Sequence, residues 1–279
     1  MIPIKQIDKE DALLIESWVG KNNPKYRIED NIIYGRLDFI NEIFAEITKP
    51  TTIVTDSGDI SLLDIDGKYV CATDFREYAN FNNIPENIIK WFGTSLNAKH
   101  AIFEHLPLGV LPEHLDAMIE IANGQKEQRD NLLYVNFGIT CSFRSILDLR
   151  INDAKQHRIE FANFAKIENP PEGISWPAYR NYLCKFFHNL LTSKYVLCPH
   201  GAGIDTFRFY EAMYLGCIPI VMDCEFYNRL KDWPILIVDS YEFINQELLN
   251  SKYEELNVRF QNIDFLKKSY YLNKIKASI

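Results

Sequence analysis

Several features that define large protein classes are missing from this sequence. No apolar run approaches the length of a membrane span, and the N-terminus carries charges where a signal peptide needs an apolar core. The six cysteines include no C-x-x-C pair, so we interpret them as buried free thiols in a reducing compartment. No internal repeat or low-complexity segment is found. We therefore expect a cytoplasmic protein without a membrane span.

The charge balance narrows the possible partners. The net charge is −8, and no run of basic residues occurs. A nucleic-acid partner is not expected, because contacts to phosphates require a basic surface. Any anion site must be a local basic patch. The 279 residues, 47% of them apolar, suffice for one large domain or two of ordinary size.

The rest of the chain is organised around residues 193–222. Residues 195–198 form a short apolar run typical of a buried strand, and residues 199–205 form a loop with two glycines. Residues 206–215 have helix composition, Gly216 stands where a helix C-terminus favours a left-handed residue, and residues 218–222 predict a second strand. The resulting βαβ unit places the loop at the carboxyl end of a parallel strand, where such sheets bind ligands.

The chemistry of this loop favours an anion. Gly201 and Gly203, with Ala202 between them, let the backbone pass close to a ligand. Asp205 or Thr206 is expected to cap the following helix, whose first N–H groups and positive dipole end face the loop. A phosphate or diphosphate suits this position.

Three polar side chains extend the predicted anion site. His200 and Arg208 add donors, and the charge of Arg208 near the first helical turn is unfavourable unless an anion lies close by. Glu211 lies on the same helix face and is expected to orient Arg208 or to accept from ribose hydroxyls. The dinucleotide fingerprint fails at Thr206, and the G-K-[ST] of nucleotide-triphosphate loops is absent. An ordinary βα turn with a surface histidine and arginine remains the alternative.

A resemblance adds to this interpretation. The run P-H-G-A-G-I-D-T-F-R-F-Y-E-A-M-Y-L-G-C-I-P-I-V is similar to the donor-binding signature of exostosin-like glycosyltransferases of family 47, in particular short stand-alone members coded by large DNA viruses of algae. The resemblance implies an α/β protein of GT-B architecture, in which two Rossmann-like domains face a cleft. It also implies a sugar nucleotide held mainly by the C-terminal domain, favours xylose, and would place a viral member in the host cytoplasm.

The N-terminal half is expected to supply the catalytic base. Residues 51–55 predict a strand that ends in a polar loop containing Asp59, and a later strand ends near Asp74. An inverting sugar transfer needs a base for the acceptor hydroxyl, and a carboxylate within hydrogen-bonding distance is the usual choice. Asp59 and Asp74 are our candidates. The alternative for each is that it caps a turn or a helix.

Further donor contacts are predicted in the C-terminal half. A strand at residues 131–137 precedes a loop at residues 138–144, and Thr140 and Arg144 in this loop are expected to hold the diphosphate. Arg158 is a candidate contact for the nucleobase. For Arg144 the alternative is a helix-surface arginine. The aromatic stripe of Tyr179, Tyr182 and Phe186 is interpreted as core.

The predicted domains are residues 1–125 on the acceptor side, residues 126–260 on the nucleotide-sugar side, and a helix at residues 261–279 that crosses back. Further helices are expected at residues 34–47, 84–92 and 176–191. The predicted function is an inverting, metal-independent transfer from a UDP-linked sugar to a glycan hydroxyl, with no cofactor. The alternatives are a non-catalytic glycan- or nucleotide-binding module of the same fold and a different Rossmann enzyme, such as an epimerase.

Overall fold

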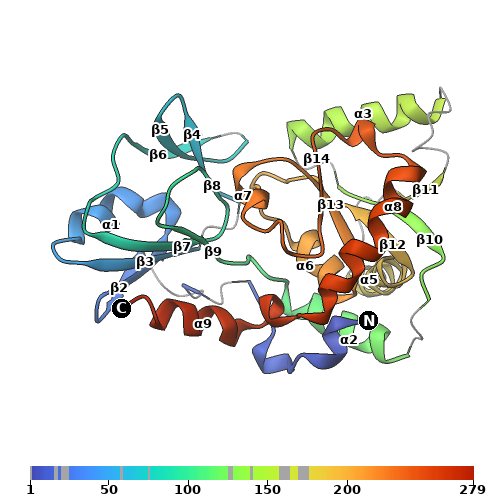
Figure 1. Ribbon diagram of the computed structural model, residues 1–279, viewed down its shortest axis with the longest axis horizontal. Coiled ribbons are helices and arrows are strands. Elements are labelled where there is room, and N and C mark those ends of the chain that lie inside the picture. Colours follow the sequence, from blue (N-terminus) through green and yellow to red (C-terminus); the bar gives the residue numbers. More distant parts are fainter. Residues whose placement is uncertain are drawn as a thin grey trace.

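A computed structural model gives the fold of the protein. The structure describes residues 2–15, 18–19, 25–56, 59–74, 76–124, 128–138, 141–156, 164–168 and 176–279, without the side chains of residues 152–156 and 176–178. Two α/β units lie side by side along the longest axis, each built around a sheet with parallel strands (Figure 1).

The C-terminal unit contains a parallel sheet whose neighbouring strands are β11 (Ala165–Ile167), β10 (Asn131–Val135), β12 (Ser193–Leu197), β13 (Ile218–Met222) and β14 (Leu236–Val238). Helices on the faces of such a sheet bury the strands on both sides, which explains why β13 and the last three residues of β12 are apolar. In chain order the strands stand as 2-1-3-4-5. The direction of winding therefore reverses between β10 and β12, and in doubly wound sheets ligands bind at the carboxyl edge of this switch point.

The N-terminal unit is smaller and mixed. Its main sheet has the order β1 (Tyr26–Glu29), β2 (Ile32–Arg36), β3 (Thr51–Asp56), β7 (Ile88–Gly93) and β9 (Phe103–His105), with β1 antiparallel and the others parallel. A second sheet contains β6 (Glu77–Phe81), β5 (Lys68–Ala72), β4 (Ser61–Ile65) and β8 (Leu96–Asn97). The expected α/β class is confirmed, with two units that each contain parallel strands and a pocket lined by residues of both.

Helices of the described residues connect and cover these strands. They are α1 (Ile40–Glu46), α2 (Pro112–Gly124), α3 (Ser142–Gln156), α5 (Trp176–Leu191), α6 (Phe207–Tyr214), α7 (Glu225–Asn228), α8 (Gln246–Asn257) and α9 (Lys268–Lys276). In the described ranges, no helix has the length and apolarity that a membrane crossing requires.

Two expected helices are wrong in part or in whole. Residues 34–47 divide into the end of β2 and the short α1, and residues 84–92 contain β7 in place of a helix. In both cases an apolar segment rich in isoleucine and aromatic residues pairs with β3, which has all six residues buried. Pairing with the buried strand β3 therefore determines the structure of these segments more strongly than the helical spacing of their apolar residues. The helix at residues 176–191 and the left-handed Gly216, with φ of 70°, are confirmed.

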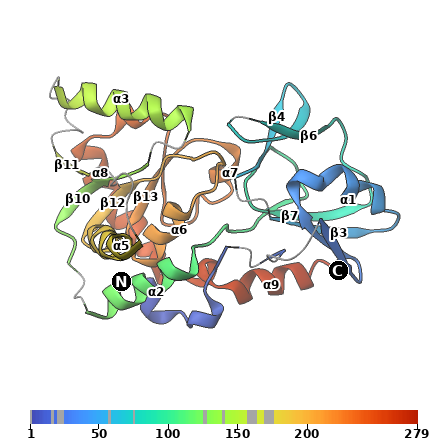
Figure 2. The same ribbon diagram turned by 180° about the vertical axis from the view of Figure 1, so that it is seen from behind.

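Each terminal segment of the chain packs against the unit formed by the other half of the sequence. The N-terminal residues lie against the C-terminal unit, whereas α9 runs under the N-terminal unit, as Figures 1 and 2 both show. The Leu13 N–H donates to the Tyr214 hydroxyl at 2.6 Å, and the Thr52 hydroxyl lies 3.1 Å from that of Ser278. The predicted limit at residue 125 stays a prediction. Because α2 packs on α5 and shares its core cluster, packing favours a limit near residue 106.

Candidate functional site

A pocket of about 420 Å³ lies at the carboxyl edge of the C-terminal sheet, where the two units meet. The switch point between β10 and β12 predicts a ligand site here. The volume lies within the range of roughly 300–1,000 Å³ that small-molecule sites occupy. Its lining residues are Asp59, Leu108, His114, Arg144, Tyr179, Tyr182, Leu183, Phe186, Gly201, Ala202, Gly203, Asp205, Thr206, Phe207, Arg208 and Glu211.

The glycine loop after β12 differs from the expected phosphate cradle. Its backbone N–H groups at Ile204 and Asp205 donate to the hydroxyls of Ser61 and Ser95, at 2.9 and 3.4 Å, and so join the loop to the N-terminal unit. The Gly201 N–H donates to the Gly203 carbonyl at 3.0 Å. These three amides are therefore occupied by protein. The groups that are available to bind an anion are therefore those at the start of α6.

The start of α6 presents unsatisfied polar atoms. Thr206 is the N-cap residue, yet its side chain makes no capping bond, and within the described residues its buried Oγ1 has no hydrogen-bond partner. The first N–H groups of any helix lack partners inside the helix and carry the positive end of its dipole. A hydroxyl and a helix N-terminus thus meet at the wall of the pocket.

Arg208 lies two residues after Thr206 and is the second residue of α6. Its guanidinium stacks over the Phe186 ring at 4.3 Å from the centroid, and its side chain is 16% exposed. Its Nε lies 3.6 Å from Glu211 Oε2, an ion pair too long for a hydrogen bond. Among the described residues, Nε and one terminal nitrogen have no hydrogen-bond partner. A buried guanidinium with spare donors is suited to bind an anionic ligand.

A hydrogen-bonded chain behind Arg208 holds Glu211 in place. His114 Nδ1 lies 2.5 Å from Glu211 Oε1, and His114 Nε2 lies 2.7 Å from the Tyr179 hydroxyl. An ionised carboxylate only accepts, so Nδ1 donates to Glu211, and a neutral imidazole then accepts from Tyr179. The predicted orienting role of Glu211 toward Arg208 thus has a geometric basis. His114 comes from α2, about a hundred residues upstream.

Arg144 lines the pocket but is used differently from the prediction. Its Nε donates to the His200 carbonyl at 3.0 Å, and its terminal nitrogens donate to the carbonyls of Pro199 at 3.0 Å and Gly138 at 3.2 Å. Burial, followed by the charge of Arg208, lowers the pKa of Arg144. At least three of its donors therefore brace the two loops at the switch point, which explains why an arginine stands there.

Two predicted residues lie away from the pocket. The His200 ring stacks on Phe143 at 4.2 Å and lines a separate cavity of about 170 Å³, and burial lowers its pKa.

The Asp74 carboxylate accepts from the backbone N–H and the hydroxyl of Ser142, at 2.9 and 2.8 Å. It caps α3 across the interface between the units, and these hydrogen bonds lower its pKa. The capping interpretation fits Asp74 better than the role of a base.

Asp59 does reach the pocket. It is exposed and lies on the side formed by the N-terminal unit. Its backbone packs closely on the glycine loop, because a Cβ built on Gly203 would lie 3.0 Å from the Asp59 carbonyl oxygen. Of the two proposed bases, Asp59 is therefore the one whose position suits the role.

Asp205 is buried, with 3% exposure. Its Oδ2 accepts from the Leu108 N–H at 2.9 Å and from the Tyr210 hydroxyl at 2.8 Å, which ties α6 to the N-terminal segment. Burial raises the pKa of Asp205 to about 8. A carboxyl that is largely neutral near pH 7 does not repel a phosphate, so Asp205 is compatible with the anion site that the sequence predicts here.

Most predicted donor residues come together, and several pocket residues were missed. Thr140 and Arg158 lie outside the described residues. His114 gives no sequence signal, since it is a single histidine in a helix, and the stripe of Tyr179, Tyr182 and Phe186 was interpreted as core although all three line the pocket. Within the described ranges, no cluster of three or more His, Cys, Asp or Glu side chains could hold a metal ion.

Comparisons with known proteins address the same region. Among solved structures, "Crystal structure of GtfA/B complex" is similar at 9% identity and a TM-score of 0.38, over 91% of this chain and 63% of that chain, which is less than two thirds of its length. A family model described as "RXYLT1 C-terminal domain" matches residues 171–232 and includes the whole stretch 193–222. The chain is therefore similar to the RXYLT1 C-terminal domain over the segment that contains α5, the glycine loop and α6.

Proposed function

We propose that this protein is an inverting glycosyltransferase that uses a nucleotide-diphosphate sugar, UDP-linked, and transfers the sugar to a hydroxyl of a glycan. The observation that carries the proposal is Arg208, whose buried donors lack hydrogen-bond partners among the described residues at the start of α6. A helix N-terminus and a guanidinium together suit a diphosphate. The similarity of residues 171–232 to the RXYLT1 C-terminal domain supports the same class.

The proposed reaction has one displacement step. The Asp59 carboxylate takes the proton of the acceptor hydroxyl, and the hydroxyl oxygen forms a bond to the anomeric carbon from the face opposite the diphosphate. The bond between that carbon and the diphosphate oxygen breaks, and its electron pair leaves with the diphosphate. Arg208 and the first turn of α6 stabilise the developing negative charge, an effect worth roughly several kcal/mol in preorganised sites. A metal-independent reaction is part of this proposal.

The sugar that we propose to test first is xylose, because the resemblance of residues 193–222 to short exostosin-like enzymes favours it. Galactose, glucuronate and rhamnose are the other donors to compare. Membership of family 47, a cytoplasmic location and a viral origin stay predictions.

The test is a panel of UDP-sugars measured in two ways. Thermal unfolding detects binding, since a ligand that binds the native state raises its stability with occupancy. Release of UDP detects hydrolysis or transfer. We expect UDP and one UDP-sugar to raise the melting temperature of the wild type and to leave that of Arg208→Ala unchanged. Arg150→Ala is the matched control, because Arg150 is an exposed arginine of α3 that pairs with Glu242 and does not line the pocket.

The outcomes separate the candidate functions. If UDP and the UDP-sugars leave the melting temperature of the wild type unchanged, the proposal is wrong. If a UDP-sugar binds but UDP is not released with any glycan acceptor, the non-catalytic binding module is favoured. Loss of binding in Arg150→Ala as well as in Arg208→Ala would indicate a general effect of charge.

A further inference from the structure

Three aromatic rings form a row along the α5 wall of the pocket. Phe186, Tyr182 and Tyr179 follow one another at helical spacing, with centroid distances of 6.0 and 6.3 Å and interplanar angles of 19° and 30°. The Phe186 face is turned to the Arg208 guanidinium at 4.3 Å. Because the planes are nearly parallel, the Tyr182 and Tyr179 faces have similar orientations. Phe186 is buried, while the two tyrosines are partly exposed to the pocket.

A partly buried chain of hydrogen bonds fixes the middle ring, Tyr182. The Tyr182 hydroxyl donates to Asn136 Oδ1 at 3.3 Å, Asn136 Nδ2 donates to the Tyr134 hydroxyl at 2.9 Å, and Tyr134 donates to Glu168 Oε2 at 3.1 Å. Each donor thus finds an acceptor, and the chain ends on a carboxylate. Burial raises the pKa of both tyrosines, which keeps their hydroxyls protonated.

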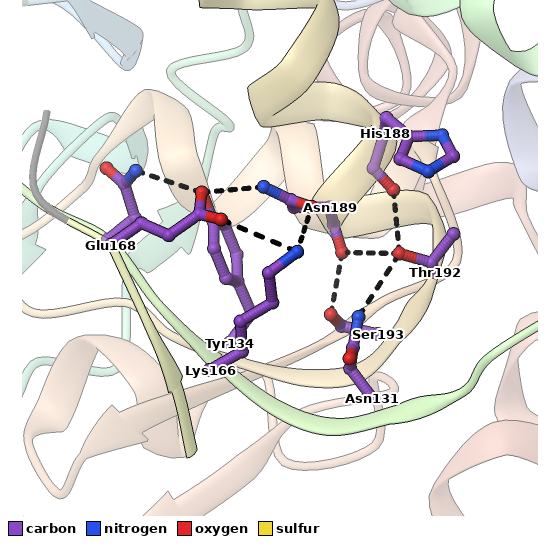
Figure 3. Close-up of polar contacts among 9 residues, drawn as sticks. Asn131, Tyr134, Lys166, Glu168, His188, Asn189, Thr192 and Ser193 are labelled. Carbon is purple, nitrogen blue, oxygen red and sulfur yellow. Dashed lines mark hydrogen bonds and ion pairs between the residues drawn. The ribbon is translucent and has the colours of Figure 1, made fainter.

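Glu168 is itself held from the other side. Asn189 Nδ2 donates to the same Oε2 at 2.7 Å, and Lys166 Nζ lies 2.6 Å from Asn189 Oδ1 and 3.4 Å from Glu168 Oε1 (Figure 3). The ring of Tyr182 is thereby anchored through the carboxyl ends of β10 and β11. This chain satisfies the Tyr182 hydroxyl, as any buried tyrosine requires, and it also fixes the orientation of the ring at the wall of the pocket.

We infer that Tyr182, with Tyr179 beside it, is a stacking platform for the nucleobase of a nucleoside diphosphate whose phosphates lie at Arg208. The inference rests on the proposed function, and it assigns a place to the nucleoside part of the donor. Every base has a π-face, so stacking binds a base without requiring hydrogen bonds to its edge. The platform and the cation are adjacent, which suits one ligand that carries an aromatic ring and a diphosphate.

The orientation of the pocket favours a base over a sugar on these rings. Asp59, the proposed base catalyst, lies on the side of the N-terminal unit. Figures 1 and 2 show α6 between α5 and the N-terminal unit along the longest axis. The reacting sugar must lie near Asp59, so the other end of the ligand lies toward α5. A sugar ring stacked on Tyr182 would be held away from the proposed base.

The experiment compares two probes by calorimetry. UDP contains the base and the diphosphate, whereas inorganic pyrophosphate contains only the anion. In Tyr182→Leu we expect the Kd of UDP to rise by about tenfold or more, which is the size of one base-stacking contact, with the Kd of pyrophosphate unchanged. Tyr182→Phe keeps the ring but loses its anchor to Asn136, so we expect its Kd for UDP to lie between those of the wild type and Tyr182→Leu. Tyr78→Leu, at an exposed tyrosine of β6, is the matched control.

Each outcome decides one question. If neither probe binds to the wild type, the proposed function fails. If UDP binds equally well to the wild type and Tyr182→Leu, the platform is wrong while the function stands. A parallel loss of UDP and pyrophosphate in Tyr182→Leu would show that the ring only supports the anion site. Unchanged binding of UDP with weaker binding of UDP-xylose would assign the ring to the sugar and overturn the inference.

Discussion

The two walls of the pocket are built in different ways. Most of the C-terminal wall comes from the stretch α5 to α6, with Arg144 and His114 added from α3 and α2. It combines aromatic rings, a helix N-terminus and a buried guanidinium whose ion-pair partner, Glu211, is held by His114. The N-terminal wall contributes Asp59. In the proposed function, the C-terminal wall binds the charged donor and the N-terminal wall contributes the Asp59 carboxylate. The comparison suggests that donor binding and proton transfer can be disabled separately.

The largest effect on this comparison is expected for Asp59→Asn. If Asp59 is the base, loss of its carboxylate should lower kcat by about 10²–10⁴-fold, the usual contribution of general-base catalysis. The Kd of UDP should stay unchanged, because the C-terminal wall is intact. Steady-state kinetics together with calorimetry measure both quantities. Normal turnover in this variant would remove the base assignment and leave the N-terminal wall without a chemical role.

Gly203→Ala tests whether turnover depends on the exact position of Asp59 relative to the C-terminal wall. A Cβ at this position would lie 3.0–3.1 Å from the Asp59 backbone, so either the loop or Asp59 must shift. We expect kcat to fall by about tenfold, since small displacements of reacting groups are costly, while UDP binding changes less. Gly201→Ala is the matched control, because its Cβ would meet the nearest atom, in the Arg144 side chain, at 3.6 Å. Equal kinetics in the two variants would contradict the coupling.

A third prediction concerns the dependence of stability on pH. The pKa of Asp205 is about 8 in the folded protein and about 3.9 in an unfolded chain. Between these values the folded state binds more protons, so this group makes the free energy of unfolding fall as pH rises from about 4 to 8. Asp205→Asn removes the titration while an amide oxygen still accepts from Leu108 and Tyr210. Urea unfolding of both proteins should show the variant gaining relative stability over this range, and a constant difference would refute it.

The smallest effect is expected for Asp74→Asn. Hydrogen bonds from Ser142 lower the pKa of Asp74, so its stabilising contribution is present above the unfolded pKa and is lost as pH falls through the folded value. We expect a slightly lower melting temperature at pH 7, a difference that vanishes in acid, and unchanged kcat. A large loss of kcat with full UDP binding would return Asp74 to the list of catalytic residues.

The sequence predicted the βαβ unit at residues 193–222 well because its determinants are local. The buried strands are apolar runs, Gly216 takes the left-handed conformation at the end of α6, and Arg208 and Glu211 meet through helical spacing. The interpretation of residues 84–92 failed because Pro85 and the apolar pattern allow either element. Pairing of β7 with β3 and β9 decided in favour of a strand.

By itself, then, the sequence determined a glycine loop and a helix between two buried strands, because close neighbours in the chain specify caps, turns and helix faces. Tertiary structure alone decided three things: that the loop amides bind Ser61 and Ser95, that His114 from α2 supports Glu211, and that Asp59 faces the pocket while Asp74 caps α3. These contacts join residues that are far apart in the chain. Their geometry depends on how the two sheets dock, and no local pattern of residues encodes that arrangement.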